Sequence, residues 1–228
     1  MKPYYEDDLI TIYNCPCMML LPHLPKIDLC LTDPPYGLSW EETGFTKKNI
    51  LERNLDTVND WDNIPDKLTF DTIKQISNSY IIWGGNYIAN ILGNCKAPFI
   101  WYKRTGNNPF ADAEIAWTSF PTGTARVFDH QWCGAFRDSE RGESYHPTQK
   151  PVALMSWCIT QALKHSAVTR IIDPFMGSGS TLRAAKNLGI KAIGIEIKEE
   201  YCEIAAKRMA QTVMNLALEA EKEGESHE

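Results

Sequence analysis

A carboxylate, two prolines and an aromatic ring follow an apolar run near the N-terminus. The run Ile27–Thr32 is typical of a strand buried on both faces, and Asp33, Pro34, Pro35 and Tyr36 come directly after it. The Asp33 carboxylate and the Pro34 carbonyl can each accept a hydrogen bond from an amine, and the prolines stiffen the turn that carries them. Tyr36 can stack on a flat ring. These residues predict a site for the amino group of a nucleobase turned out of a duplex.

A glycine-rich turn follows a second apolar run, Arg170–Asp173, near the C-terminus. Its glycines allow close approach to the backbone, and the helix expected after them offers unpaired N–H groups. The turn lacks both the Gly-Lys-Ser/Thr ending of a P-loop and the G-x-G-x-x-G pattern of a dinucleotide site, so it does not require a phosphate. A purely structural strand-to-helix turn could have the same composition. The candidate binding residues here are Asp173, Phe175, Gly177, Ser178, Gly179 and Thr181.

A second acidic residue, Glu196, lies near the end of the next predicted strand, 23 residues after Asp173. An acid at this distance, on a neighbouring strand, can accept both hydroxyl protons of a ribose. A glycine turn combined with a ribose-binding acid fits a nucleoside cofactor without a pyrophosphate. The natural candidate is S-adenosylmethionine.

Strand and helix patterns alternate along the chain. The predicted strands are Leu9–Tyr13, Ile27–Thr32, Tyr80–Trp83, Pro98–Tyr102, Glu114–Ser119, Ile171–Asp173 and Ala192–Ile197. The predicted helices are Asp71–Ser77, Pro151–Leu163, Thr181–Leu188 and Glu199 to about Ala220. Such alternation favours an α/β fold with a mostly parallel sheet, which binds ligands at the carboxyl ends of its strands. Both candidate motifs lie at such ends.

The bulk composition is that of an ordinary globular protein, with 228 residues, 43% of them hydrophobic. We expect residues 1–220 to form a single domain and residues 221–228 an acidic tail. The net charge is −6, but residues 219–228 hold five Glu and one Lys, which leaves −6 − (−4) = −2 for the rest. Apolar runs long enough for a membrane span, and a signal-peptide core, are both missing from the sequence. We therefore expect a cytoplasmic protein.

The seven cysteines do not indicate a metal centre. Cys15-Pro16-Cys17 holds the only close pair, and a second pair at ligand spacing does not follow. We predict no metal. Phosphate binding would need a local basic patch, for which Lys47-Lys48 and Lys103-Arg104 are candidates.

Taken together, these motifs resemble those of DNA amino-methyltransferases of the β group, in which the catalytic motif precedes the cofactor motif. The matching segments are Asp33–Tyr36, His146–Pro151, Asp173–Thr181, Gly194–Glu196 and the positions Tyr201, Ala205 and Arg208, with weaker matches at Trp101, Lys103 and Glu114-Ile115. The resemblance implies a Rossmann-like S-adenosylmethionine-dependent methyltransferase fold, with a seven-stranded, mostly parallel sheet and one antiparallel strand. It also implies that Thr148, Gln149 and Lys150 help to enclose the methionine end of the cofactor.

The function that this resemblance implies is site-specific methyl transfer to the N6 amino group of adenine in DNA. Asp33 and Pro34 would accept the amino protons, and Tyr36 would stack on the flipped base. In the family, Asp at the first position of the motif favours adenine and Ser favours cytosine, so N4-cytosine methylation is the main alternative. A non-catalytic subunit that binds S-adenosylmethionine, and an RNA or protein-glutamine methyltransferase, are further alternatives.

Two departures from the family pattern concern the ligands. Pro16 stands where relatives often have an Asp that contacts the cofactor adenine. The segment expected to read DNA, residues 120–145, is short, and residues 38–79 form a second candidate DNA-facing segment. A homodimer is compatible with the sequence, and the sequence does not say whether a restriction partner exists.

Overall fold

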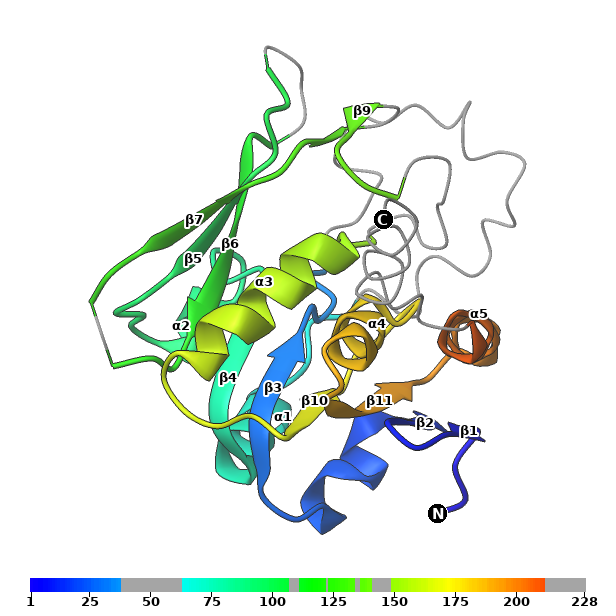
Figure 1. Cartoon of the computed structure of the whole chain (residues 1–228). Helices are drawn as coiled ribbons and strands as arrows, with labels where there is room; N and C mark the ends of the chain where they lie inside the picture. The colour runs from blue at the N-terminus through cyan, green and yellow to red at the C-terminus, as the bar shows by residue number, and fades with distance from the viewer. Residues whose placement is uncertain (38–62, 107–110, 122, 134–135, 141–148, 212–228) are drawn as a thin grey trace, which may run out of the picture.

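A nine-stranded sheet forms the centre of the molecule (Figure 1). The computed structural model describes residues 1–37, 63–106, 111–121, 123–133, 136–140 and 149–211. The strand order across the sheet is β1 (Tyr5–Glu6), β2 (Ile10–Asn14), β11 (Lys191–Glu196), β10 (Arg170–Asp173), β3 (Ile27–Thr32), β4 (Ser77–Trp83), β6 (Ala113–Thr118), β5 (Phe99–Tyr102) and β7 (Arg126–Asp129). A separate hairpin pairs β8 (Trp132–Cys133) with β9 (Phe136–Arg137).

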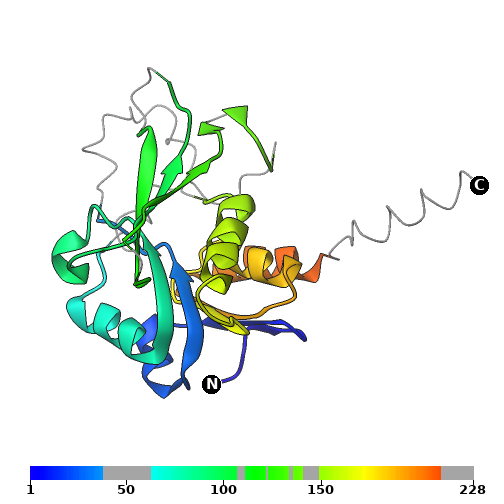
Figure 2. The same cartoon turned by 60° about the vertical axis from the view of Figure 1, so that its left-hand side comes forward.

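Helices cover both faces of this sheet (Figure 2). One layer consists of α3 (Val152–Leu163), α4 (Ser180–Asn187) and α5 (Glu199–Ala210). The other consists of α1 (Lys67–Ile76), α2 (Ala89–Leu92) and the short 3-10 turns η1 (Cys17–Met19) and η2 (Leu21–His23). Each layer closes its own apolar core against the sheet, because the central strands bury side chains on both faces.

The predicted fold class is confirmed, but the strand count was wrong. Seven strands from β2 to β5 match the expected sheet, and among them only β6 runs antiparallel to its neighbours. The described sheet has two further edge strands: β1, antiparallel to β2, and β7, parallel to β5. Both are short and lie at an edge, so they lack the continuous apolar run that marks a buried strand.

Three local predictions also need correction. The first predicted helix begins earlier, at Lys67, because Asp66 caps it by accepting a hydrogen bond from the Thr69 amide at 2.8 Å. No strand was predicted in the segment 120–145, but its residues 126–129 form β7. The predicted helix Pro151–Leu163 begins one residue later, at Val152, because Pro151 is its N-cap.

The topology fixes where ligands can bind. β3 lies between β10 and β4, and the chain leaves β3 towards β4 while β10 returns on its other side. Ligands of such sheets bind outside the carboxyl ends of the strands at this switch point. The Asp33 motif follows β3 and the glycine turn follows β10, so the fold places the two motifs side by side. Within the described part of the chain, no helix is long and apolar enough to cross a bilayer.

Candidate active site

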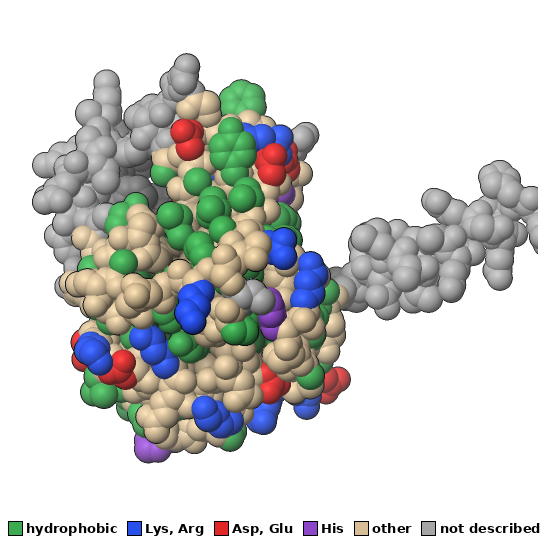
Figure 3. Space-filling model, turned by 90° about the vertical axis from the view of Figure 1, so that its left-hand side faces the viewer, with side chains coloured by type: hydrophobic (Ala, Val, Ile, Leu, Met, Phe, Trp, Pro, Cys, Tyr) green, Lys and Arg blue, Asp and Glu red, His purple; other side chains and the backbone are tan. Residues whose placement is uncertain are grey.

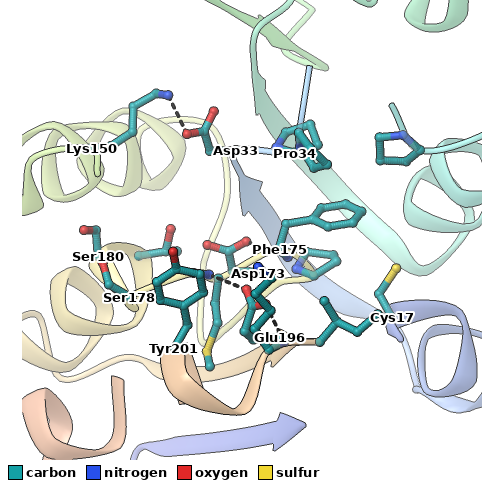
Figure 4. Close-up of a pocket in the computed structure, with 18 of the residues that line it drawn as sticks. Cys17, Asp33, Pro34, Lys150, Asp173, Phe175, Ser178, Ser180, Glu196 and Tyr201 are labelled. Carbon is teal, nitrogen blue, oxygen red and sulfur yellow. Dashed lines mark hydrogen bonds and ion pairs between the residues drawn. The ribbon is translucent and has the colours of Figure 1, made fainter. Parts of the chain in front are cut away.

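One cavity of about 420 Å³ lies at the carboxyl ends of β3, β10 and β11 (Figure 4). Its wall includes the Asp33–Tyr36 turn, the glycine-rich turn and Glu196, which the sequence had singled out separately. Cys15, Pro16 and Cys17 line it as well. The volume is within the usual range for small-molecule sites. The two predicted motifs therefore open into a single cavity.

The Asp33 carboxylate lies at the carboxyl end of β3 and is bound by two side chains. Lys150 Nζ lies 2.5 Å from Asp33 Oδ2, and the Tyr36 hydroxyl donates a hydrogen bond to Oδ1. Burial raises the pKa of the Asp33 carboxyl, although the Lys150 ammonium acts in the opposite direction. Burial and the nearby Asp33 charge raise the pKa of Tyr36 well above its usual value, so Tyr36 remains a neutral phenol that donates.

The ring of Tyr36 is packed against two neighbours. Its centroid lies 5.0 Å from that of Tyr87, and the two rings stack at 23°. Gly84 has a φ of +75°, and a Cβ at this position would lie 2.0 Å from Tyr36 Cε1. Only glycine fits this close approach. Gly84, at the end of β4, therefore fixes the ring beside the Asp33 carboxylate.

A row of alternating charges extends from Asp33 across the strand ends. Lys150 Nζ lies 3.0 Å from Glu114 Oε2 on β6, and Glu114 Oε1 also pairs with Lys103. Burial acts to raise the pKa of Glu114, but the Lys150 and Lys103 charges lower it to about 2. Burial acts to lower the pKa of Lys150, yet Asp33 and Glu114 raise it above its usual value. Glu114 and Lys150 are therefore charged at neutral pH.

Asp173, the last residue of β10, is buried directly before the glycine turn. Its Oδ1 accepts hydrogen bonds from Thr32 Oγ1 at 2.6 Å and from the Phe175 amide at 3.1 Å. Burial raises the pKa of Asp173 to about 6, although these hydrogen bonds act to lower it. Since Thr32 immediately precedes Asp33, its hydroxyl ties the end of β3 directly to the end of β10.

Glu196, at the end of β11, shapes the other wall of the cavity. Its Oε2 accepts from the Gly177 amide at 3.0 Å and its Oε1 from the Lys198 amide at 2.8 Å. Burial raises the pKa of the Glu196 carboxyl, against the effect of these amides. Nearby, at the start of α4, Ser180 Oγ is buried and has no hydrogen-bond partner among the described residues. An unpaired polar atom in the wall is what a bound polar ligand would satisfy.

Arg208 on α5 ties the glycine turn to the segment that precedes α3. It donates to the Ser178 carbonyl at 2.7 Å and pairs with Glu140 at 3.3 Å. Glu140 also accepts from the Gln149 side chain at 3.1 Å and from the Val152 amide at 2.8 Å. Glu140 therefore links the start of α3 to the cofactor side of the cavity.

Most of the predicted site residues come together in this cavity. The predicted residues in its wall are Asp33, Pro34, Pro35, Tyr36, Gln149, Lys150, Asp173, Phe175, Gly177, Ser178, Thr181 and Glu196. Gly179 does not line the cavity: its φ is +81°, and a Cβ there would lie 3.1 Å from Ala205 Cβ on α5. Thr148 lies outside the described residues. Lys150, expected beside the methionine end of the cofactor, lines the cavity, and its nearest charged partner is Asp33.

Sequence reasoning missed the roles of Thr32, Gly84, Glu114 and Glu140. A charged residue in the otherwise apolar strand β6 was the available signal for Glu114. The basic pair Lys103-Arg104, a candidate phosphate contact, is engaged with acids: Lys103 with Glu114, and Arg104 with Asp129 at 2.6 Å. Lys47-Lys48 lies outside the described residues.

With this geometry established, comparison with known proteins decides the family. The sequence profile of the DNA methylase family that covers N6 and N4 amino-methyltransferases matches residues 27–207. The chain belongs to this family. A Type II methyltransferase of Streptococcus pneumoniae, M2.DpnII, is 41% identical over 91% of this chain and 92% of its own length. M.HinfI of Haemophilus influenzae is 26% identical over 94% of this chain and 72% of its own length.

Solved structures agree on the fold. The complex of M1.HpyAVI with S-adenosylmethionine superposes with a TM-score of 0.58 at 24% identity, covering 89% of this chain and 100% of that chain. The cytosine-N4-specific PvuII methyltransferase gives a TM-score of 0.58 at 16% identity, covering 96% of this chain and 92% of that chain. The predicted family, its methyltransferase fold and its cofactor, S-adenosylmethionine, are confirmed.

Proposed function

We propose that this chain methylates the N6 amino group of adenine in DNA, on a base turned out of the duplex. The observation that carries the proposal is the Asp33 carboxylate at the end of β3. It lies in the wall of the cavity that also contains the glycine turn, and Tyr36 is held beside it. Asp at this position favours adenine in the family that the motif resembles.

The residues that follow the carboxyl end of β3 would act on the amine. An aromatic amine is a poor nucleophile because its lone pair is delocalised into the ring. Asp33 Oδ and the Pro34 carbonyl can accept the two amino protons, which favours a pyramidal nitrogen with its lone pair outside the ring plane. After the nitrogen has gained the methyl group it must lose one proton, and Asp33 is the nearest carboxylate to receive it.

The opposite end of the cavity suits S-adenosylmethionine. The residues that would hold it are Glu196 at the ribose hydroxyls, Phe175 against the adenine, and Asp173 with the glycine turn at the methionine end. The unpaired Ser180 Oγ adds a polar atom that a ligand can satisfy. When bound, S-adenosylmethionine supplies an electrophilic methyl group on a positively charged sulfur.

N4-cytosine methylation is the second candidate, because the required amine chemistry is the same. The superposition on the PvuII cytosine-N4 enzyme supports the shared fold and does not separate the two bases. Asp33, rather than Ser, at the first position of the motif favours adenine.

Identification of the methylated base tests the proposal. DNA incubated with the protein and S-adenosylmethionine is digested to nucleosides, which are identified by mass spectrometry. We expect N6-methyladenine, and N4-methylcytosine alone would refute the assignment. The Asp33→Ala variant should lose methyl transfer while its affinity for S-adenosylmethionine stays within a few-fold. Retention of more than about a tenth of the wild-type rate would exclude the role given to Asp33.

A further inference from the structure

The catalytic carboxylate is not free to receive a base in this structure. Lys150 lies on Asp33 Oδ2 and the Tyr36 hydroxyl lies on Oδ1. Each oxygen can accept a second hydrogen bond, but an ammonium in contact makes a carboxylate a weaker acceptor and a weaker base. An incoming amine must therefore compete with Lys150 for the same charge.

Separating Lys150 from Asp33 costs free energy, because the buried ammonium cannot reach water. Only 5% of its side chain is exposed, and a buried ammonium that loses its counter-ion is costly. Glu114 provides a second counter-ion, because its Oε2 already lies 3.0 Å from Lys150 Nζ. The ammonium can shift its main contact from one carboxylate to the other without leaving its pocket.

We propose that Glu114 is a positioning residue that shares Lys150 with Asp33 and retains the ammonium when Asp33 turns to the amine of the target base. Glu114 contacts Lys150 rather than the base, and it acts on the reaction through the charge of that side chain. The inference rests on the proposed function, in which Asp33 receives the amine. Glu114 lies on β6, which is separated from β3 by β4 in the sheet, so a strand outside the cavity would take part in methylation of the base.

The charged groups around Asp33 make the effect measurable. Lys150 and the neutral Tyr36 hydroxyl contact Asp33, and the charges of Glu114 and Asp173 lie near enough to interact with it. Lys103 acts on Asp33 through its pair with Glu114. Removing the Glu114 charge leaves Lys150 wholly to Asp33, so Asp33 should titrate at a lower pH. Removing the Lys103 charge strengthens the attraction between Glu114 and Lys150 and weakens that between Lys150 and Asp33. Asp33 should therefore titrate at a higher pH.

The experiment uses Glu114→Gln, which keeps the shape of the side chain, in the full-length protein. The Asp33 carboxyl carbon is titrated by NMR without DNA, and single-turnover methylation is measured with saturating S-adenosylmethionine as a function of pH. We expect Asp33 to titrate at lower pH, the acidic limb of the rate profile to move to lower pH, and the plateau rate to fall roughly tenfold or more. The dissociation constant for S-adenosylmethionine should change less than about twofold, because Glu114 is not among the residues that line the cavity.

A remote ion pair provides the matched control. Asp7 pairs with Lys186 at 2.6 Å, is partly buried like Glu114, and also has a pKa lowered to about 2 by its hydrogen bonds against the effect of burial. Asp7→Asn should leave both the Asp33 titration and the plateau rate unchanged. Lys103→Met is the second variant and should move the Asp33 titration in the direction opposite to Glu114→Gln.

The outcomes separate this inference from the proposed function. If the Asp33 titration does not move in Glu114→Gln, or if the plateau rate is retained, Glu114 does not share Lys150 and the inference is wrong. If Lys103→Met moves the titration in the same direction as Glu114→Gln, the shared ammonium is likewise refuted. If the wild type methylates cytosine instead of adenine, the assignment of the base fails, while the comparison of variants still reports on the same amine chemistry.

Discussion

At the scale of single residues, Gly84 offers a direct test of how Tyr36 is positioned. In Gly84→Ala the new methyl group would overlap the Tyr36 ring, and the backbone would be strained at a φ of +75°. We expect a lower methylation rate and a loss of about 1–2 kcal/mol in the free energy of unfolding. Affinity for S-adenosylmethionine should change little. Single-turnover rates, chemical denaturation and calorimetric titration measure the three quantities.

Gly189, which follows α4, provides the control for backbone strain alone. It has a φ of +68°, and a Cβ there would meet nothing within 4 Å. Gly189→Ala should therefore show a loss of stability of about 1–2 kcal/mol without the loss of rate. Equal rate losses in the two variants would show that the Tyr36 contact is not the cause.

Asp173 predicts how cofactor binding depends on pH. Burial raises its pKa to about 6, so the carboxylate is charged above this pH and protonated below it. S-adenosylmethionine carries positive charges that a carboxylate attracts, so its affinity should fall as the pH decreases through about 6. Calorimetric titration between pH 5 and 8 measures this. Burial also raises the pKa of Glu196, so Glu196→Gln and Asp173→Asn must be compared.

The two variants should differ in one respect. Asp173→Asn should bind the cofactor more weakly and with little pH dependence, whereas Glu196→Gln should keep the pH dependence centred near 6. A wild-type affinity that is constant from pH 5 to 8 would mean that the Asp173 charge does not contribute.

At the scale of elements, the contact between α5 and the glycine turn depends on Arg208. Its guanidinium is buried between the Ser178 carbonyl and the Glu140 carboxylate. Arg208→Met would leave Glu140 without this cation and cost about 3 kcal/mol in the free energy of unfolding. The affinity for S-adenosylmethionine should fall as well, because the turn loses its support. Chemical denaturation and calorimetric titration give both values.

The neighbouring residue on α5 is a suitable control. Lys207 is exposed, and among the described residues its ion pair is with Glu203 of the same helix, at 2.7 Å. Lys207→Met should change the free energy of unfolding by less than about 0.5 kcal/mol. If Arg208→Met behaves like Lys207→Met, the link between α5 and the glycine turn is not structural.

The elements also show which parts of the fold can be predicted from sequence. The strand Ile27–Thr32 was predicted with its observed bounds, because a strand buried on both faces is a continuous apolar run. β7 was missed, because it lies at an edge with most of its side chains exposed. Elements that bury apolar side chains leave a pattern in the sequence, and exposed edge strands do not.

In the candidate site, too, some features could be predicted from the sequence and others could not. Asp33, Asp173 and Glu196 were found because each ends an apolar run, where a polar residue is conspicuous. The pairing of Lys150 with Glu114 joins residues 36 positions apart on different elements. Only the sheet order brings them together, so local spacing could not predict the contact.

At the scale of the whole molecule, the distribution of charge predicts how the affinity for DNA depends on salt. The face shown in Figure 3 carries scattered Lys and Arg side chains with apolar side chains between them. In the described residues, several of the cations already pair with acids, among them Lys103, Arg104, Lys186 and Arg208. Binding to DNA should therefore weaken with salt along a shallow slope, because few phosphates are neutralised.

The recognition sequence should be short, on the order of two to four base pairs for this chain alone. Arginine and lysine are the commonest readers of guanine, and residues 120–145 supply only Arg126, Arg137 and Arg141. Arg137 already lies over the Trp132 ring, at 4.3 Å from its centroid. Single-molecule sequencing of DNA methylated by the purified protein gives the motif. A strict motif of six or more base pairs would contradict this prediction.

The continuity of the cavity from the Cys15–Cys17 segment to the Asp33–Tyr36 turn has a consequence for inhibition. Two small molecules that occupy one cavity can be replaced by one molecule that joins them, and the joined ligand loses less translational and rotational freedom on binding than two separate ones. A compound that links an adenosine to an aminopurine through a short tether would therefore compete with cofactor and DNA at once. Its affinity should exceed that of either half.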